Sequence, residues 1–225
     1  MNLTPTLVLA LFAAGIAAGA ALVARWRIVG PGFLWVTGAS VVLFGGVAAF
    51  ISGQAVAWAG TVVALVASVA ARRPGAAAAG FGLAAAAFAI VASADSPWIG
   101  VVTGVVLFGG VTTEMLLGHW FLVDPRLPRR SLKVLDVIGG AGLLGEVAFV
   151  VASSTLTFSG AAGVFTLTYL VLAAFTALLL VGVWFSLSEP RYSGVMAATG
   201  LSYLAVLTTF GVIALGRALA AGAFA

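Results

Sequence analysis

Long apolar runs separated by short polar breaks dominate this chain. Eight such runs can be delimited, at residues 4–25, 31–51, 55–71, 76–94, 98–123, 132–153, 163–188 and 193–219. Each is close to the roughly 20 residues that an α-helix needs to cross a hydrocarbon core about 30 Å thick. The pattern predicts an all-α fold: a polytopic integral membrane bundle of eight transmembrane helices, forming a single transmembrane domain over residues 1–225 without a soluble domain.

Basic residues fall almost entirely in alternate breaks between the runs. Nine of the ten Lys and Arg residues follow the first, third, fifth or seventh run, and the exception is Arg217 near the C-terminus. The breaks after the second, fourth and sixth runs contain no Lys or Arg. Short loops rich in Lys and Arg stay in the cytoplasm. We therefore expect a multi-pass protein of the cytoplasmic (inner or plasma) membrane with both termini outside.

A cleaved signal peptide is the alternative interpretation of the first run, because Ala18, Gly19 and Ala20 are small enough for a cleavage site. A signal peptide normally carries a basic leader, however, and no Lys or Arg precedes this run. The charge pattern therefore favours an uncleaved first helix.

The composition excludes a soluble enzyme. The chain is 63% hydrophobic and 7% charged, whereas about a quarter of the residues of a soluble domain are charged. It contains no Cys and one His, so it can form neither a thiolate metal site nor a bis-His haem within the chain. Phosphate-binding loops and catalytic triads are also absent. The sequence therefore predicts no cofactor and does not indicate an enzyme.

Glycine marks the expected contacts between helices. Because lipid is as apolar as Leu, membrane helices associate through close packing of small residues. Gly15 and Gly19, and also Gly100 and Gly104, have four-residue spacing, and glycine is frequent in the sixth and eighth runs. We interpret these glycines as packing positions.

One short sequence occurs twice, since residues 41–46 and 105–110 both read VVLFGG. The two copies fall in the second and fifth runs, which the predicted topology orients in opposite directions. One hypothesis is an inverted repeat of runs one to three and four to six, an arrangement found in many transporters. The alternative is coincidence, because the chain consists largely of Ala, Val, Leu and Gly.

Four ionisable residues lie within the fifth and sixth runs: Glu114, His119, Asp136 and Glu146. An acidic group at bilayer depth costs about 2.5 to 3.5 kcal/mol, so it normally faces the bundle interior and is paired, protonated or functional. We expect Glu114 about 12 Å and Glu146 about 21 Å from the cytoplasmic ends of their helices, with His119 and Asp136 only about 5 Å deep. No Lys or Arg is expected deep in any helix, so Glu114 and Glu146 should be protonated or bind a cation or a hydrogen-bonding ligand.

Helical angles distribute these residues over different faces. Glu114 and His119 point about 140° away from each other, so they do not form a metal-chelating pair. Asp136 and Glu146 share one side of their helix at a separation of about 15 Å along the axis. This side of the helix is therefore a candidate polar track.

The break between the fifth and sixth runs is short, so these helices should be antiparallel neighbours. His119 and Asp136 then lie at matching depth, and a contact between the imidazole and the carboxylate is one interpretation. The other is that His119 anchors its helix at the membrane interface, while Asp136 pairs with Lys133 or Arg130.

The densest charge in the chain lies between these two runs and at the start of the sixth, at Arg126, Arg129, Arg130 and Lys133. Such a segment usually only determines topology. It also suits contacts with anionic lipid headgroups or with a partner. Other membrane subunits or further copies of this chain are compatible partners, whereas nucleic acid is not expected.

Two functional hypotheses follow from these residues. The first is a small proton- or cation-coupled transporter or channel, in which Glu114 and Glu146 carry the proton or cation and His119 and Asp136 serve near the cytoplasmic surface. The second is a non-catalytic integral membrane subunit of a larger complex, such as a respiratory complex. In that case the buried acids serve packing, quinone contact or proton access.

Overall fold

The computed structural model describes residues 2–153 and 156–223. This part of the chain is all-helical and contains no strands. Eight of its helices are long and apolar enough to cross a membrane, which confirms the expected number and the multi-pass class of protein. They are α1 (Pro5–Trp26), α2 (Pro31–Ser52), α3 (Ala55–Val69), α4 (Pro74–Ala92), α5 (Trp98–Phe121), α6 (Arg129–Ala152), α7 (Gly160–Ser188) and α8 (Tyr192–Ala220). A short 3-10 turn, η1 (Ala70–Arg72), extends α3.

The start of α6 is the boundary that matters most for the candidate residues. We expected this helix from residue 132, but it begins at Arg129. Arg129 and Arg130 therefore lie on the helix rather than in the preceding loop. Asp136 consequently lies about 10 Å from the start of its helix instead of about 5 Å.

Proline and threonine determine where several helices begin. α1, α2 and α4 start at Pro5, Pro31 and Pro74. At this first position the missing N–H leaves no hydrogen bond unmade, and the φ of proline is already helical. Thr4 caps α1, because its Oγ1 accepts a hydrogen bond from the N–H of Leu7 at 3.0 Å.

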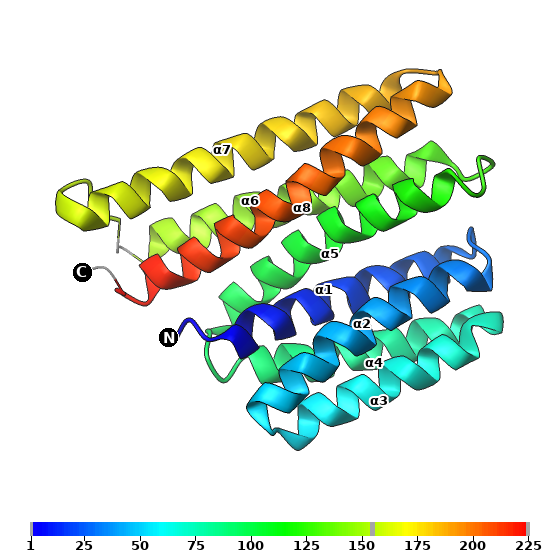
Figure 1. Ribbon diagram of the computed structural model, residues 1–225, viewed down its shortest axis with the longest axis horizontal. Coiled ribbons are helices and arrows are strands. Elements are labelled where there is room, and N and C mark those ends of the chain that lie inside the picture. Colours follow the sequence, from blue (N-terminus) through cyan, green and yellow to red (C-terminus); the bar gives the residue numbers. More distant parts are fainter. Residues whose placement is uncertain (1, 154–155, 224–225) are drawn as a thin grey trace.

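The helices pack as two groups of four, α1–α4 and α5–α8 (Figure 1). In the first group α1 and α3 each contact both α2 and α4, and in the second α5 and α7 each contact both α6 and α8. α4 thus completes the first group rather than beginning a second. The grouping gives no support to an inverted repeat of helices one to three and four to six, since the two VVLFGG segments lie in α2 and α5, which hold different places in their groups.

α1 and α5 form the contact between the two groups. A Cβ atom added to Gly15 would lie 2.7 Å from the backbone nitrogen of Gly109, and one added to Gly109 would lie 2.9 Å from the carbonyl oxygen of Gly15. One turn further along, a Cβ on Gly19 would overlap the side chain of Thr113. The two backbones approach this closely only because both helices carry glycine at the contact.

Glycine also brings α6 against the opposite side of α5. A Cβ on Gly110 would lie 2.2 Å from the backbone nitrogen of Gly139, and a Cβ on Gly142 would lie 2.3 Å from that of Leu107. The expectation that α5 and α6 are neighbours is confirmed by this packing. The interpretation of glycine as a marker of helix contacts is supported as well.

The two ends of the bundle differ in charge. The start of α1 and the end of α8 lie at the same end (Figure 1), which we call the terminal end. There Thr4 Oγ1 donates a hydrogen bond to the Asp95 carboxylate of the α4–α5 connection at 2.7 Å. The opposite end, which we call the basic end, holds the α1–α2, α3–α4, α5–α6 and α7–α8 connections. Its basic residues are Arg25, Arg27, Arg72, Arg73, Arg126, Arg129, Arg130, Lys133 and Arg191.

Buried ionisable side chains are confined to the second group of helices. Within the described part of the chain, those that carry charge are Glu114, Asp136, Glu146 and Arg217, and none is more than 5% exposed. The interior of α1–α4 consists instead of aliphatic and aromatic residues with a few hydroxyls. Any ionic chemistry inside the bundle therefore belongs to α5–α8.

Two glycines of α6 test the packing of α5 against α6. Gly142→Ala should lower the free energy of unfolding by about 1 to 3 kcal/mol, because the new methyl group overlaps the α5 backbone. Gly140→Ala should leave it unchanged or raise it by up to about 1 kcal/mol, since a Cβ at Gly140 meets nothing within 4 Å. Denaturant unfolding in detergent micelles measures both, and equal effects of the two variants would contradict the close approach.

Candidate functional site

A fully buried ion pair joins α6 to α8. Arg217 and Glu146 are both 0% exposed. One guanidinium nitrogen of Arg217 lies 2.8 Å from Oε1 of Glu146, and the other donates a hydrogen bond to Oε2 at 3.0 Å. Each carboxylate oxygen thus lies near one guanidinium nitrogen, and one of the two contacts is a charge-assisted hydrogen bond.

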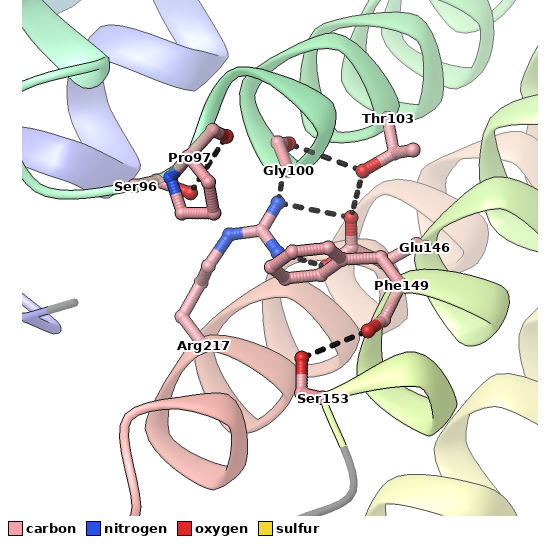
Figure 2. Close-up of polar contacts among 8 residues, drawn as sticks. All are labelled: Ser96, Pro97, Gly100, Thr103, Glu146, Phe149, Ser153 and Arg217. Atoms are coloured by element: carbon pink, nitrogen blue, oxygen red, sulfur yellow. Dashed lines mark hydrogen bonds and ion pairs between the residues drawn. The ribbon is translucent and has the colours of Figure 1, made fainter.

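α5 completes the surroundings of this pair (Figure 2). The guanidinium also donates to the carbonyl oxygen of Gly100 at 2.6 Å, and the hydroxyl of Thr103 donates to Oε2 of Glu146 at 2.8 Å. The ring of Phe149 lies against the guanidinium, with Cζ of Arg217 at 4.6 Å from the ring centroid. Three helices therefore supply polar or aromatic partners to one buried charge pair.

The glycine pair in α5 makes room for this arrangement. A Cβ atom on Gly100 would lie 3.3 Å from Cζ of Arg217, and one on Gly104 would lie 3.2 Å from a guanidinium nitrogen. The four-residue spacing that we interpreted as helix packing thus accommodates the arginine side chain.

The expectation that Glu146 has no basic partner is wrong, because Arg217 neutralises it. The error came from treating Arg217 only as the exception to the charge distribution. Its position contained a usable indication: Glu146 lies about 9 Å from the terminal end of α6 and Arg217 about 5 Å from the terminal end of α8. A comparison of the depths of charged residues in helices that are not consecutive in the sequence would have predicted the pair of Glu146 and Arg217.

Glu114 lies in a different environment, between α5 and α8. It is 2% exposed, and the Ser202 hydroxyl donates a hydrogen bond to its Oε2. Its Oε1 has no hydrogen-bond partner among the described residues. The ion pairs formed within residues 2–153 and 156–223 are Arg217–Glu146 and Arg191–Glu189. In this part of the chain Glu114 therefore has no cationic partner.

Asp136 lies at the same depth as Glu114. Asp136 is about 10 Å from the basic end of α6, and Glu114 is about 10 Å from the basic end of α5. The two helices that carry them pack closely against each other. Asp136 is 5% exposed, and it lines a groove of about 330 Å³ between α6 and α7. Asp136 is thus reached from the outer surface of the bundle.

His119 does not join these acids. Its Nδ1 lies 3.3 Å from the hydroxyl of Tyr203 on α8, and the His119 side chain is exposed. No hydrogen bond or ion pair connects His119 with Asp136 in the described structure, so the expected contact is wrong. Asp136 forms no ion pair with Lys133 or Arg130 there either. The physical reason is the earlier start of α6, which carries Asp136 deeper than His119.

Hydroxyl groups line the interior toward the Glu146–Arg217 pair. Thr209 lies seven residues after Ser202 and eight before Arg217 on α8. Tyr169 of α7 lies beside the pair, since a Cβ atom on Gly216 would lie 3.2 Å from its Cε2 and 3.4 Å from Oε1 of Glu146. Both hydroxyls are buried and have no hydrogen-bond partner within the described residues. The two acidic levels are therefore separated by a largely apolar interior with isolated polar groups.

The basic residues around the α5–α6 connection differ in their contacts. Arg129 donates hydrogen bonds to the carbonyl oxygens of residues 189, 190 and 191, which fixes the α7–α8 connection against α6. Lys133 donates to the hydroxyl of Ser188 at 2.8 Å. Arg126 and Arg130 are exposed at the surface.

A larger groove, of about 850 Å³, lies at the basic end between α1 and α4. Its walls are mostly alanine, and its ionisable residues are Arg25 and Arg27. The groove thus lies in the apolar group of helices, away from the buried acids. No group of three or more potential metal ligands occurs in the described part of the chain.

No protein-family model matches this chain, and no curated protein or solved structure matches it significantly. The geometry of α5–α8 is therefore the basis for a functional proposal.

The buried ion pair gives a stability prediction. Arg217→Met should lower the free energy of unfolding by about 3 to 5 kcal/mol, because it leaves the Glu146 carboxylate buried without its counter-ion. Adding Glu146→Gln should recover much of this loss, since it removes the uncompensated charge. Denaturant unfolding in detergent measures the single and double variants.

The control for this prediction is the exposed pair between Arg191 and Glu189, whose charged atoms are 3.7 Å apart. Arg191→Met should change stability little, because solvent screens such a pair. A double variant as unstable as Arg217→Met alone would show that the two charges are not coupled.

Proposed function

We propose that the protein is a small proton- or cation-coupled transporter in which Glu114 and Asp136 bind the transported proton or cation. The observation that carries this proposal is the environment of Glu114. The carboxyl group is 2% exposed, has a hydroxyl donor on one oxygen and has no cationic partner within the described residues. A buried acid without a counter-ion is expensive to maintain for packing alone.

Asp136 gives this site its access. It shares the depth of Glu114 on the neighbouring helix and lines the groove between α6 and α7. Two nearby carboxyl groups attract a cation more strongly than one does. In the proposed mechanism a proton or cation passes from the basic end to Asp136 and then to Glu114. No cofactor takes part in this step.

The Glu146–Arg217 pair supplies the other end of the proposed path. A proton or cation that reaches Glu146 competes with Arg217 for the same carboxylate oxygens. Separation of the pair then frees the guanidinium from α6, while its hydrogen bond to Gly100 still holds it on α5. The pair is therefore proposed as the gate toward the terminal end rather than as a free carrier. His119, held by Tyr203 at the outer surface, has no part in the path.

We also propose that the basic end faces the cytoplasm in the cytoplasmic membrane, with both termini outside. The support is the distribution of charge, since nine of ten Lys and Arg residues gather at one end of the bundle. Loops that retain such residues stay on the cytoplasmic side.

Cysteine labelling tests this orientation, because the native chain has no Cys. Ser131→Cys, at the basic end, should react with an impermeant thiol reagent only after the cytoplasmic side is opened. Ser159→Cys, at the terminal end, should react in intact cells. Ser52→Cys is the matched control and should behave like Ser159→Cys, because the α2–α3 connection lies at the same end. Labelling of Ser131→Cys and Ser159→Cys from one side would contradict the topology.

The transport proposal is tested by flux in proteoliposomes containing the purified protein. Wild-type protein should move protons or monovalent cations down an imposed gradient. Glu114→Gln and Asp136→Asn preserve shape and hydrogen bonding but remove the charge, so each should lower the flux at least tenfold. Ser202→Ala should lower it less, because it removes only a donor to Glu114.

Glu189→Gln is the control for these variants, because Glu189 is an exposed acid at the α7–α8 connection. This variant should transport like wild type. Thermal unfolding verifies that all variants are folded. Wild-type protein without flux of any proton or cation, or full flux in folded Glu114→Gln, would eliminate the proposal.

The second candidate function, a non-catalytic subunit of a larger membrane complex, is favoured by the Glu146–Arg217 pair. This pair gives one of the two deep acids a structural role, as expected if the buried charges serve packing. Mild solubilisation and size-exclusion chromatography of the native protein separate the two candidates. A stable stoichiometric complex, together with absence of flux from the isolated protein, would favour the subunit.

A further inference from the structure

We propose that the groove between α6 and α7 is a binding site for one anionic phospholipid, with the headgroup at the basic end and one acyl chain between the helices. The proposal is tested without measuring transport, but it concerns the groove that gives Asp136 its access in the proposed path, so a bound acyl chain would occupy that access. It is built on two adjoining hollows, one polar and one apolar.

The polar hollow lies at the mouth of the groove. It is lined by Arg129, Arg130 and Lys133 from α6 and by Leu187, Ser188 and Pro190 from the end of α7. No acidic side chain contributes to its lining. Its chemistry therefore suits an anion, and a phosphate with a polar headgroup fits a hollow open to solvent.

The apolar hollow continues from this mouth along the same two helices. Its walls are Val137, Gly140 and Leu144 of α6, with Leu180 and Val181 of α7 among those facing them. From Asp136 to Leu144 this wall is about 12 Å long, which is close to the roughly 15 Å thickness of one leaflet. The dimension suits an acyl chain in the leaflet of the basic end.

Lys133 links the two hollows. Its ammonium group lines the polar hollow and lies 4.8 Å from the ring centroid of Trp184, which lines the apolar one. The ammonium group donates one hydrogen bond to the hydroxyl of Ser188, and an ammonium group has three N–H donors. Lys133 is therefore held at the junction and retains donors for a phosphate.

The balance of charge favours an anionic lipid over a zwitterionic one. The two hollows contain three basic residues and one acid, Asp136, which gives a formal charge of +2. Arg129 keeps its charge although its donors are engaged by backbone carbonyls. A chain seated in the groove also covers the side of Asp136 that faces away from the bundle, so the lipid would separate this acid from bulk hydrocarbon.

The test uses phosphatidylglycerol with a photoactivatable acyl chain, added to the full-length protein in phosphatidylcholine nanodiscs. Cross-links mapped by mass spectrometry should concentrate on residues of the groove, at Val137, Leu144 or Val181. Excess unlabelled phosphatidylglycerol should suppress them, while excess phosphatidylcholine or free glycerol phosphate should not. Suppression by glycerol phosphate would instead assign the site to a soluble phosphate.

Different variants test the headgroup site and the acyl-chain site separately. The double variant Arg130→Gln with Lys133→Gln should reduce the cross-links at least fivefold, and Arg126→Gln is its control, because Arg126 is a basic residue of the same connection that does not line the hollow. Gly140→Leu should fill the apolar hollow and reduce the cross-links similarly. Gly82→Leu on α4 is its control, since a Cβ at either glycine meets nothing within 4 Å.

The proposal is overturned if cross-links spread evenly over the eight helices, if a phosphatidylcholine probe labels the groove equally, or if Arg126→Gln weakens labelling as much as the double variant. Retained labelling in Gly140→Leu would also overturn it, because the chain would then lie elsewhere. Circular dichroism and elution volume verify that each variant is folded.

Discussion

The close approach of α5 to its neighbours is the constraint on which the rest of the structure depends. α5 carries glycine toward three helices: Gly109 meets α1, Gly110 meets α6, and Gly118 faces Thr199 of α8. In surroundings as apolar as the side chains themselves, hydrophobic exclusion does not hold helices together, and the contact distance between backbones decides the packing. α5 therefore both connects the two groups of helices and forms the wall of the polar interior.

That wall explains why charge is tolerated inside one group of helices and absent from the other. Gly100 supplies a carbonyl and, with Gly104, the space for the guanidinium of Arg217. More than two turns after Gly104, the same helix places Glu114 against Ser202 of α8. A buried ion pair costs desolvation that its hydrogen bonds must offset, and three helices meet here to supply the bonds of one guanidinium nitrogen and of Oε2 of Glu146. The unpaired acid lies at the opposite level, which makes the two ends of this interior chemically different.

The surface of α6 and α7 adds a second difference between the ends. Arg129 fixes the α7–α8 connection through three backbone carbonyls, while Lys133 lies between Ser188 and Trp184. The basic residues that the sequence groups as one cluster thus divide into Arg129, which holds the neighbouring connection, and residues that line a hollow open to solvent. Such a division depends on which donors the backbone has already engaged, and charge counting does not reveal it.

The number of helices and their ends to within three residues follow from the sequence, because hydrocarbon length and proline chemistry act locally along the chain. The inward orientation of Glu114 and Glu146 follows as well, since an acid deep in an apolar helix normally faces the bundle interior, whereas the sequence places Asp136 only near the interface. The partners of these acids were decided only by the tertiary structure. Arg217 is 71 residues from Glu146, and a three-residue shift in the start of α6 moved Asp136 from the level of His119 to that of Glu114. Contacts between helices depend on the depth and rotation of one helix relative to another. Both arise from packing between segments distant in the chain, so the sequence of a single helix does not determine them.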